Sequence, residues 1–472
     1  DADADADTDA DTDTDTDTGT DTGEEWIPLK HPIREASARL HDTIRSVVYV
    51  SWTQVEEADT TWVEYSFDAG VWLSTPVSEA GMGAHEQIVL GVPYGETVTW
   101  RVAVRKAHQV VTSGEETLAV GSLPSSLPLA SVSVSEADEL EPTGNYLITS
   151  VTERNPLYYT DAHFWLVIVD RQGRVVWALA CPRGTWTFFA KPSHDGAYLL
   201  WDESYYWTSF GGSDDGVVNQ MKLDGEIVHS WATPNLHHSF DDLDANTIIW
   251  NNLEDHDDVV YLSEGEAPME QVWSCLDWIF EEDLGLEANP ANEECAANAI
   301  SWNEDSHTVL LSIWTHEIVL ELDPSTGEVL WYADPNRGLG YQVTPEEARW
   351  MWQHEPVLLS DGNLLLSCGV YDGAPGWTYD HTAAFEYTID HDAQVIELVW
   401  SYLSERSWVF AYRGGAERLP DGNTLHFYGD VGGVRELNPA GDVVWELTFT
   451  RAGGDAWVGR SRLVEDLYPL GP

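Results

Sequence analysis

Two histidine motifs stand out, because an imidazole can do chemistry near neutral pH that few other side chains can. His238 lies in an H-H-S motif (237–239), and His354 lies in a Q-H-E motif (353–355). A neutral imidazole is a nucleophile in this pH range. Arg413, further along the chain, would add a positive charge that stabilises an anion. These three residues are the predicted catalytic candidates, and His237 and Trp352 beside them are predicted to bind a substrate. A surface ion pair is the alternative for Arg413, and His237 could instead orient His238 or be exposed.

The elements that position these residues are predicted from a sixfold repeat. One recurring segment is a β-branched strand that ends in Trp. Its copies are at 173–177, 225–231, 270–273, 327–331, 397–400 and 441–445. A hairpin turn of the D-G-N kind alternates with it, since Gly and Asn tolerate the positive φ of a tight turn. Its copies are at 144–147, 195–199, 244–248, 305–309, 361–365 and 421–425.

One more strand separates these two segments, and the strand before each turn gives every unit four antiparallel strands. Six such units predict an all-β, six-bladed β-propeller over residues 123–472. Two stacked sandwiches are the alternative, but they would not call for six similar units. The Trp residues that end the recurring strands are predicted to pack in the core.

In a propeller the first strand of each blade lines the channel. The register of the repeats places His238 and His354 at equivalent positions in two blades, so both imidazoles are expected to face one cavity. The same position holds Phe188, Ala296 and Gly414 in other blades. Two structural imidazoles that cap strands are the alternative interpretation. His426 is expected to be a packed or surface histidine.

Residues 26–122 are predicted to form a small β-sandwich before the propeller. Alternating strands lie at 47–52, 62–66 and 97–104. Their order resembles a fibronectin type III or immunoglobulin-like module. Such modules space or dock a neighbour, so no chemistry is assigned to this one.

The order of the motifs resembles the bacterial arylsulfotransferase family. That family has a sandwich followed by a six-bladed propeller, with H-H-D and Q-H-D motifs, L-P-D-G-N turns and a Y-R-a-x-R-i-x-x-L-Y-P-like ending. The corresponding segments here are 237–239, 353–355, 419–423 and 459–469. The resemblance implies transfer of a sulfuryl group from a phenolic sulfate to a phenolic acceptor through a channel histidine, without a nucleotide donor. It also implies that Trp-rich walls stack the aryl groups.

The sequence departs from the family pattern at three positions. Ala383 stands where the family has an Arg, the fourth-blade His position falls near Ala296, and the segment 412–418 holds no His where the family has its nucleophile. A second hypothesis is therefore a non-catalytic propeller at the cell surface that binds a ligand or a protein. A purely structural surface protein is the third. The expected ligand is a small phenolic sulfate or another anionic aromatic molecule.

Composition excludes several classes of protein. The 472 residues include 82 Asp and Glu against 22 Lys and Arg, which gives a formal net charge of -60. Such a surface repels phosphate backbones, so no nucleic-acid partner is expected. No apolar run is long enough to span a membrane. No cofactor or metal centre is predicted, although the acidic clusters at 254–258 and 390–392 offer oxygen ligands as an alternative to solvated loops.

The chain is predicted to be secreted, periplasmic or displayed at the cell surface. It begins with Asp-Ala and Asp-Thr repeats, interpreted as a mature N-terminus with a tether over residues 1–25. A plain disordered tail and a calcium-binding Asp run are the alternatives. Cys275 and Cys295 flank an acidic insertion and are the candidates for a disulfide, whereas Cys181 and Cys368 are expected to be buried thiols.

Overall fold

The computed structural model describes residues 28–471, except 69, 154–162, 205–214, 255–256, 266, 283, 285–294, 371–380, 410–413 and 452–453. This part of the chain is built mainly of antiparallel β-strands, with one α-helix, α1 (Cys275–Glu281). None of its helices has the length and apolar character needed to cross a membrane. The predicted tether at 1–25 lies outside the described residues.

The N-terminal strands form two sheets that share one core. The first sheet contains β1 (Ile33–Leu40), β2 (Val48–Gln54) and β6 (Gly83–Val89). The second contains β3 (Thr60–Ser66), β4 (Leu73–Ser74), β5 (Ser78–Glu79), β7 (Thr97–Lys106), β8 (Gln109–Thr112) and β9 (Glu116–Ala119). Alternate residues of β2 are buried, as expected for a strand with one face on a core. Trp52, Tyr65 and Trp100 from the two sheets pack in the same cluster.

The remaining strands form further antiparallel sheets, in which β27 and β31 are a parallel pair. The first strands are β10 (Leu129–Ser135), β11 (Tyr146–Glu153), β12 (Phe164–Asp170) and β13 (Val175–Ala180). The next sheet holds β14 (Ala190–Pro192), β15 (Leu199–Glu203), β16 (Val217–Met221) and β17 (Ile227–Ala232). It is followed by β18 (Leu236–Asp244), β19 (Thr247–Glu254), β20 (Asp257–Glu264) and β21 (Glu270–Ser274).

Two five-stranded sheets and a final set of strands complete this part. The first of them holds β22 (Ala297–Asn303), β23 (Thr308–Ile313), β24 (Ile318–Asp323), β25 (Glu328–Asp334) and β26 (Leu339–Gly340). The second holds β27 (Gln342–Thr344), β28 (Met351–Leu358), β29 (Leu364–Val370), β30 (His381–Asp390) and β31 (Val395–Leu403). The last strands are β32 (Gly415–Arg418), β33 (Thr424–Tyr428), β34 (Gly433–Leu437), β35 (Val443–Arg451), β36 (Gly454–Val458) and β37 (Arg462–Val464).

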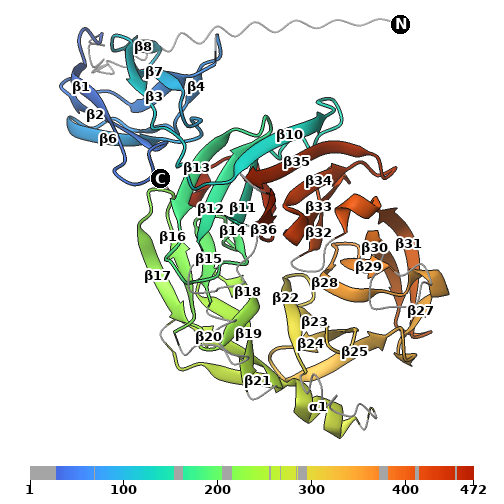
Figure 1. Cartoon of the computed structure of the whole chain (residues 1–472). Coiled ribbons are helices and arrows are strands. Elements are labelled where there is room, and N and C mark those ends of the chain that lie inside the picture. The colour runs from blue at the N-terminus through green and yellow to red at the C-terminus, as the bar shows by residue number, and fades with distance from the viewer. Residues whose placement is uncertain are drawn as a thin grey trace, which may run out of the picture.

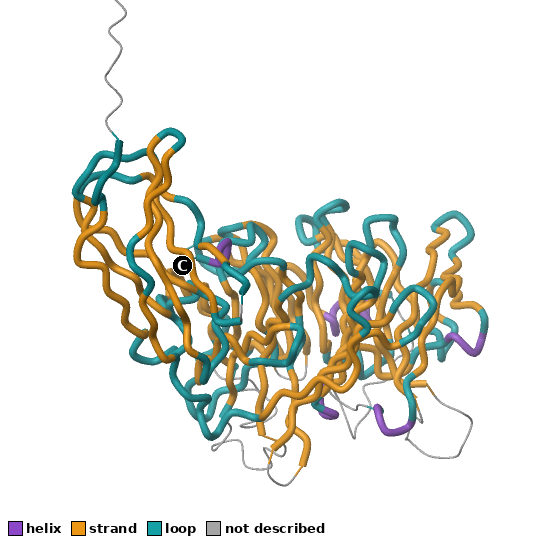
Figure 2. The backbone as a smooth tube through the Cα atoms, turned by 90° about the horizontal axis from the view of Figure 1, so that it is seen from above, coloured by secondary structure: helices purple, strands orange, loops and turns teal. Residues whose placement is uncertain are grey.

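The sheets follow one another around a common centre, which Figure 1 shows with β14, β18, β22, β28 and β32 toward the middle. The predicted D-G-N turns join these inner strands to the next strand outward. Gly362 and Gly422 occupy two of the turns with φ angles of 85° and 96°, which only glycine adopts without strain. Figure 2 shows the ring edge-on, with the two-sheet N-terminal part at one side. A mainly β chain with several sheets of four or five mostly antiparallel strands is therefore confirmed.

Strands from both ends of the ring close it, and this corrects one prediction. The sequence predicts that the strand before the turn at 144–147 belongs to the first unit. That strand, β10, pairs instead with β35 of the last sheet. The inner partner of β11 comes from the C-terminal segment, because β36 and β37 both pair with β11. The prediction was wrong because the repeat pattern shows which strands exist but not which distant strands pair.

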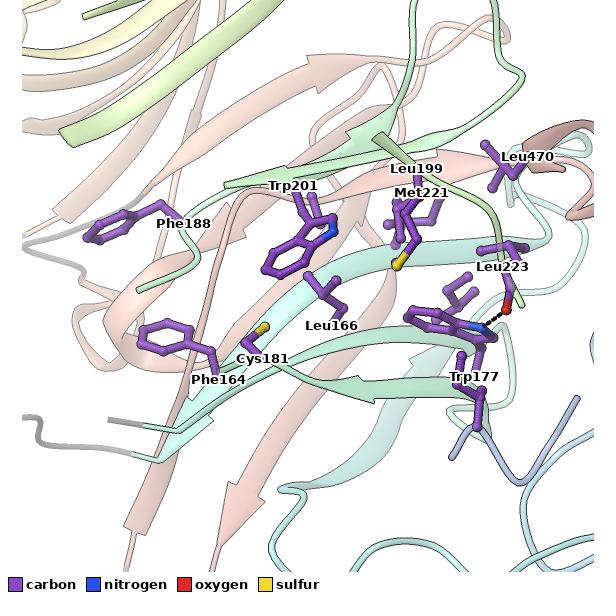
Figure 3. Close-up of a cluster of buried hydrophobic side chains, with 14 of the residues drawn as sticks. Phe164, Leu166, Trp177, Cys181, Phe188, Leu199, Trp201, Met221, Leu223 and Leu470 are labelled. Atoms are coloured by element: carbon purple, nitrogen blue, oxygen red, sulfur yellow. Dashed lines mark hydrogen bonds between the residues drawn. The ribbon is translucent and has the colours of Figure 1, made fainter. Parts of the chain in front are cut away.

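The recurring Trp residues lie in the core, as predicted. Trp177, Trp231, Trp273, Trp331 and Trp445 are buried and Trp400 is half-buried. One cluster that includes Trp177 runs from the N-terminal sheets to the inner face of the ring, and it also contains Ile44, Phe164, Phe188 and Leu470. Figure 3 shows Phe164 and Phe188 at one end of this cluster and Trp177 and Leu470 at the other. The N-terminal sheets and the ring therefore share a continuous apolar core.

Candidate functional site

His354 lies on the inner strand β28, at a break in its regular pairing. The register with β29 shifts on both sides of His354, and Trp352 and Glu355 have positive φ angles of 52° and 46°. Positive φ is uncommon outside glycine and persists only where the surroundings hold it. The irregular backbone therefore fixes the orientation of this imidazole.

The surroundings of His354 keep it neutral. Its side chain is buried, and Nδ1 lies 2.8 Å from the carbonyl oxygen of Trp352. Burial lowers the pKa of His354 to about 4, the Trp352 carbonyl opposes this shift, and the charge of Arg460 adds to it. A carbonyl only accepts hydrogen bonds, so Nδ1 carries the proton. At pH 7 the lone pair of the neutral ring is then on Nε2.

His238 lies on β18 in a similarly irregular stretch. The register with β19 shifts between Leu236 and Phe240, and His238 has a φ of 22°. Its half-buried ring lies 5.5 Å, centroid to centroid, from the ring of Phe188, which the sequence placed at the equivalent position of another unit. The Nδ1 atom of His237 is 2.8 Å from Nδ1 of His238. This contact lets His237 orient His238.

A buried arginine of the C-terminal segment, Arg460, connects the two histidine motifs. Its guanidinium donates from Nη1 to Oγ of Ser239 in the first motif. It donates from Nη2 to the carbonyl oxygen of Asn298 at 2.6 Å. Asn298 in turn donates from Nδ2 to the carbonyl oxygen of Gln353, in the second motif, at 2.8 Å. One positive charge therefore lies between the strands that carry the two imidazoles.

The backbone of Arg460 is held against the residues just before β14. Its N–H donates to the carbonyl oxygen of Phe188 at 3.0 Å, and its guanidinium carbon lies 5.3 Å from the ring centroid of Phe189. Burial lowers the pKa of Arg460, and the charge of Glu355 opposes this shift. The nearest approach to that carboxylate is 3.9 Å, from Nε to Oε2. Arg460 is therefore a buried cation whose ion pair with Glu355 is loose, and the charges of Asp202 and Asp241 also favour its protonated form.

Glu355 pairs more closely with a second arginine. Its Oε1 accepts from Nη2 of Arg462 at 2.6 Å. Burial disfavours the charge of Arg462, but Glu355 and Glu417 more than offset this, so its pKa is raised. Burial raises the pKa of Glu417 to about 7. The positive charge of Arg462 lowers this pKa, whereas the negative charge of Glu355 raises it further. Glu417 is therefore partly protonated near neutral pH.

The Glu355 carboxylate also limits the size of the residue at the start of β32. A Cβ atom built on Gly415 would lie 2.0 Å from Oε2 of Glu355 and 2.2 Å from the ring of Phe427. A side chain at position 415 would therefore displace the carboxylate. This is the segment in which the resembling family is expected to carry a histidine.

A further buried ion cluster lies along β18 beyond the histidines. Lys191 pairs with Asp241, and its Nζ lies 2.5 Å from Oδ1 of Asp242. Asp241 also accepts from the backbone N–H of Trp302 at 2.7 Å. These charges satisfy one another and are structural partners of the inner strands.

Aromatic side chains lie beside the imidazoles. The ring centroids of Trp314 and Trp352 are 5.8 Å apart. Trp314 and Trp457 are partly buried and pack against the cluster that contains Phe188 and Ala296. Flat aromatic faces next to imidazoles and a guanidinium suit a ligand with an aryl group and an anionic group.

The structure brings some predicted residues together and separates others. His237, His238, Trp352 and His354 lie on inner strands joined through Arg460, whereas Arg413 lies outside the described residues. Among the described residues no group of His, Cys, Asp and Glu has the arrangement of a metal site.

Two further residues of the family comparison are buried in the core. Ala383 lies on β30, fully buried in an apolar cluster. His426 is packed, as one of its two interpretations had it: its Nε2 is 2.7 Å from Oγ of Ser367, and burial lowers its pKa to about 3.

Arg460 and Arg462 were not among the predicted site residues. The sequence carried a signal for them, since both lie in the R-x-R ending at 460–462 that resembles the family pattern. Knowing that this ending pairs with β11 inside the ring would have placed them at the centre.

The described fold and site define a class of protein: a ring of antiparallel sheets with imidazoles and a buried guanidinium on its inner strands. Residues 285–450 match the model of the arylsulfotransferase (ASST) family. The resemblance seen in the sequence motifs is therefore confirmed for this part of the chain. No curated protein sequence matches the chain.

Several solved structures are similar to the chain at low identity. The periplasmic gluconolactonase PpgL of Pseudomonas aeruginosa matches with 12% identity and a TM-score of 0.40, over 86% of this chain and 99% of that one. A catalytically inactive virginiamycin B lyase of Staphylococcus aureus with quinupristin matches with 8% identity and a TM-score of 0.35, over 66% and 86%. Hsv2 of Kluyveromyces marxianus matches with 11% identity and a TM-score of 0.32, over 72% and 87%.

Proposed function

We propose that the chain is an arylsulfotransferase-like enzyme that moves a sulfuryl group from a phenolic sulfate to a phenolic acceptor through a channel histidine. The proposal includes a six-bladed propeller at 123–472 behind an immunoglobulin or fibronectin III-like sandwich at 26–122. Its main support is Arg460, whose guanidinium connects the motifs of His238 and His354. A sulfate ester bound there would have a cation at its oxygens and an imidazole near its sulfur.

The other residues have supporting roles in this proposal. Trp352 and Trp314 stack the aryl group, and His237 orients His238. Arg413 supplies a second positive charge at the sulfate. Sulfuryl transfer needs a nucleophile and stabilisation of charge spread over three oxygens, and neutral imidazoles with guanidinium groups supply both.

A non-catalytic binding module is the second candidate, because two observations favour it. Ala383 lies in an apolar cluster, so no cation is available from the position where the family has an Arg. The Glu355 carboxylate fills the space beside Gly415, near the expected position of the family nucleophile. In this case the same residues would bind a phenolic sulfate or another anionic aromatic ligand without turnover.

We also propose that the protein works outside the cytoplasm, secreted or held at a cell surface by the segment 1–25. The bond between Cys275 and Cys295 supports this, since disulfides persist mainly in oxidising compartments. Cys181 and Cys368 are free and buried, as predicted.

The enzyme proposal is tested by incubating the protein with 4-nitrophenyl sulfate and a phenol. We expect release of 4-nitrophenol, formation of the acceptor's sulfate ester, and a protein species heavier by one sulfuryl group in mass spectra. His354→Gln should abolish all three, while His391→Gln in the exposed 390–392 turn serves as the matched control. Binding of the ester without turnover in the folded parent would establish the binding module instead.

A further inference from the structure

The hydrogen bonds around His237 assign its proton to one nitrogen. Oδ1 of Asn251 accepts from the backbone N–H of Ser239 at 3.1 Å, and Nδ2 of Asn251 donates to the carbonyl oxygen of Ala297 at 3.1 Å. These two contacts fix the orientation of the amide. Its Nδ2 therefore also donates to Nε2 of His237, 3.0 Å away. His237 must accept at Nε2, so the proton of its neutral ring is on Nδ1.

This assignment passes to the next ring. His237 Nδ1 donates across 2.8 Å to Nδ1 of His238, which must accept. The proton of His238 is therefore on Nε2. His238 cannot gain a second proton on Nδ1 without breaking the contact with His237. His238 cannot donate its Nε2 proton and take a new proton from Nδ1 of His237 either. His237 would then have no proton on either ring nitrogen.

His354 has the opposite arrangement. Its Nδ1 donates to the carbonyl oxygen of Trp352, so Nε2 carries the lone pair. One imidazole of the site is thus set as a donor at Nε2 and the other as a nucleophile at Nε2. The two rings are not interchangeable, although the sequence places them at equivalent positions.

We propose that His354 is the nucleophile and that His238 lends a hydrogen bond without transferring its proton, which restricts the donor to sulfate esters of acidic phenols. This inference rests on the proposed sulfuryl transfer and deepens it. His237 is then a positioning residue, which acts through His238.

The sulfuryl group is transferred in two steps. The Nε2 lone pair of His354 forms a bond to sulfur, and the bond between sulfur and the aryl oxygen breaks with its electron pair on oxygen. The phenol leaves as phenolate, stabilised by the hydrogen bond from His238 and by Arg460. In the second step an acceptor phenol loses its proton to solvent, its oxygen bonds to sulfur, and the electron pair of the N–S bond returns to Nε2. Since no proton reaches the departing oxygen, the stability of the phenolate controls the rate.

The first experiment measures kcat/KM for a series of aryl sulfates whose phenols differ in pKa, with one acceptor at one pH. We expect kcat/KM to fall by roughly three- to tenfold for each unit by which the phenol pKa rises. Rates nearly independent of the leaving phenol would overturn the proposal, because they would mean that a proton is transferred to it.

The second experiment compares two isosteric variants of His237 with the parent. Asn places an amide donor where His237 has Nδ1, whereas Leu removes the donor. The histidine tautomers are read from long-range ¹H–¹⁵N spectra of the labelled protein. We expect His238 to carry its proton on Nε2 in the parent and in His237→Asn. In His237→Leu we expect His238 to lose this fixed tautomer, and kcat/KM to depend less steeply on the pKa of the leaving phenol.

The two experiments separate this inference from the proposed function. A proton on Nδ1 of His238 in the parent, or the same tautomer behaviour in the Asn and Leu variants, overturns the inference even if sulfate is transferred. If the tautomers are as expected but no ester is turned over, the proposed sulfuryl transfer is overturned. The restriction on the donor is then overturned with it.

Discussion

Arg460 and the imidazoles meet although they come from distant parts of the sequence. The guanidinium gives two donors to Ser239 and Asn298, while its distance to the Glu355 carboxylate is 3.9 Å. A buried cation with a loose partner keeps part of its desolvation cost uncompensated. An incoming anion at this place would recover some of that energy, so Arg460 should dominate anion affinity.

Arg460→Lys tests this, because lysine keeps the charge but lacks the planar fork that spans Ser239 and Asn298. We expect the affinity for 4-nitrophenyl sulfate to fall by at least about tenfold, since a charge-assisted hydrogen bond contributes about 1.5–3 kcal/mol. Calorimetric titration measures it. Arg39→Lys, at an exposed arginine 3.5 Å from Glu86, is the control. Equal affinities of the two variants would contradict the role of Arg460.

His354 should make the protein sensitive to acid. Its folded pKa is about 4 against an ordinary value of 6.5, so between these values the unfolded chain binds a proton that the folded one does not. This contribution to stability is full above about pH 6.5 and is lost as pH falls toward 4. The facing groups are Arg460, whose charge stays constant there, and the Trp352 carbonyl.

We therefore expect His354→Gln to lose less stability than the parent between pH 6.5 and 4, measured by urea unfolding at a series of pH values. His391→Gln should follow the parent. Parallel curves for the parent and His354→Gln would show that the imidazole is not buried in its neutral form.

At this scale the sequence predicted the imidazoles better than the cations. His238 and His354 each lie on a strand that precedes a recurring turn, so the register of the repeats places them without knowledge of long-range pairing. Arg460 lies outside any repeat unit, and only the pairing of β36 and β37 with β11 brings it inside the ring. The hydrogen bond between His237 and His238 depends on side-chain orientation at a positive φ, which no pattern of residue types reveals.

Among the elements, the segment between β36 and β37 has little room for a larger residue. A Cβ on Gly459 would lie 2.1 Å from Oγ of Ser150 and 2.6 Å from the carbonyl oxygen of Phe188. Gly459 thus lets the chain pass close to two inner segments and sets the position of Arg460.

Gly459→Ala should lower the free energy of unfolding by about 1–3 kcal/mol, the usual cost of overpacking, and weaken aryl sulfate binding. Chemical denaturation and titration measure the two effects. Gly114→Ala is the matched control, because no atom lies within 4 Å of a Cβ at Gly114. A variant as stable as this control would mean that the closing segment is not tightly held.

The disulfide between Cys275 and Cys295 joins the start of α1 to the segment just before β22. With a separation of 20 residues, the cross-link should contribute about 3 kcal/mol by restricting the unfolded chain. Cys275→Ala/Cys295→Ala should lower the thermal unfolding midpoint but leave aryl sulfate affinity unchanged, since α1 lies at the outer rim (Figure 1). A reductant should not affect this variant. A large loss of affinity would connect the loop to the site.

The strands themselves were predictable, but their partners at the closure were not. Strand β10 has the alternation of an ordinary strand, and nothing local shows that it pairs with β35 rather than β11. The pairing of β10 with β35 is favoured because the C-terminal strands β36 and β37 occupy the inner position beside β11. Local patterns determine which residues form strands, whereas competition for sheet edges determines the closure.

For the whole molecule, closure at both ends joins the N-terminal sheets to the ring. Tyr468, close to the C-terminal end, lies with its hydroxyl 3.3 Å from the backbone N–H of Leu90 and 3.5 Å from the hydroxyl of Tyr65. Ile44 and Leu90 share a core with Leu470. We infer that the two parts unfold together, because separating them would expose this common core.

The net charge of -60 acts on the same whole-molecule equilibrium. Carboxylates crowd together in the folded state and move apart on unfolding, so their repulsion opposes folding. Salt shortens the range of this repulsion to about 10 Å at 0.1 M. The thermal unfolding midpoint at pH 7 should therefore rise steeply with the first few tenths molar NaCl and then level off.

Screening and cation binding make different predictions for this experiment. If screening is the cause, choline chloride raises the midpoint as much as NaCl at equal ionic strength, because the bulky cation cannot enter a carboxylate site. The increase should also shrink near the isoelectric point of about 4.2, where many carboxylates are protonated. A midpoint that rises with NaCl but not with choline chloride would show that the acidic surface is stabilised by bound metal cations rather than by weaker repulsion.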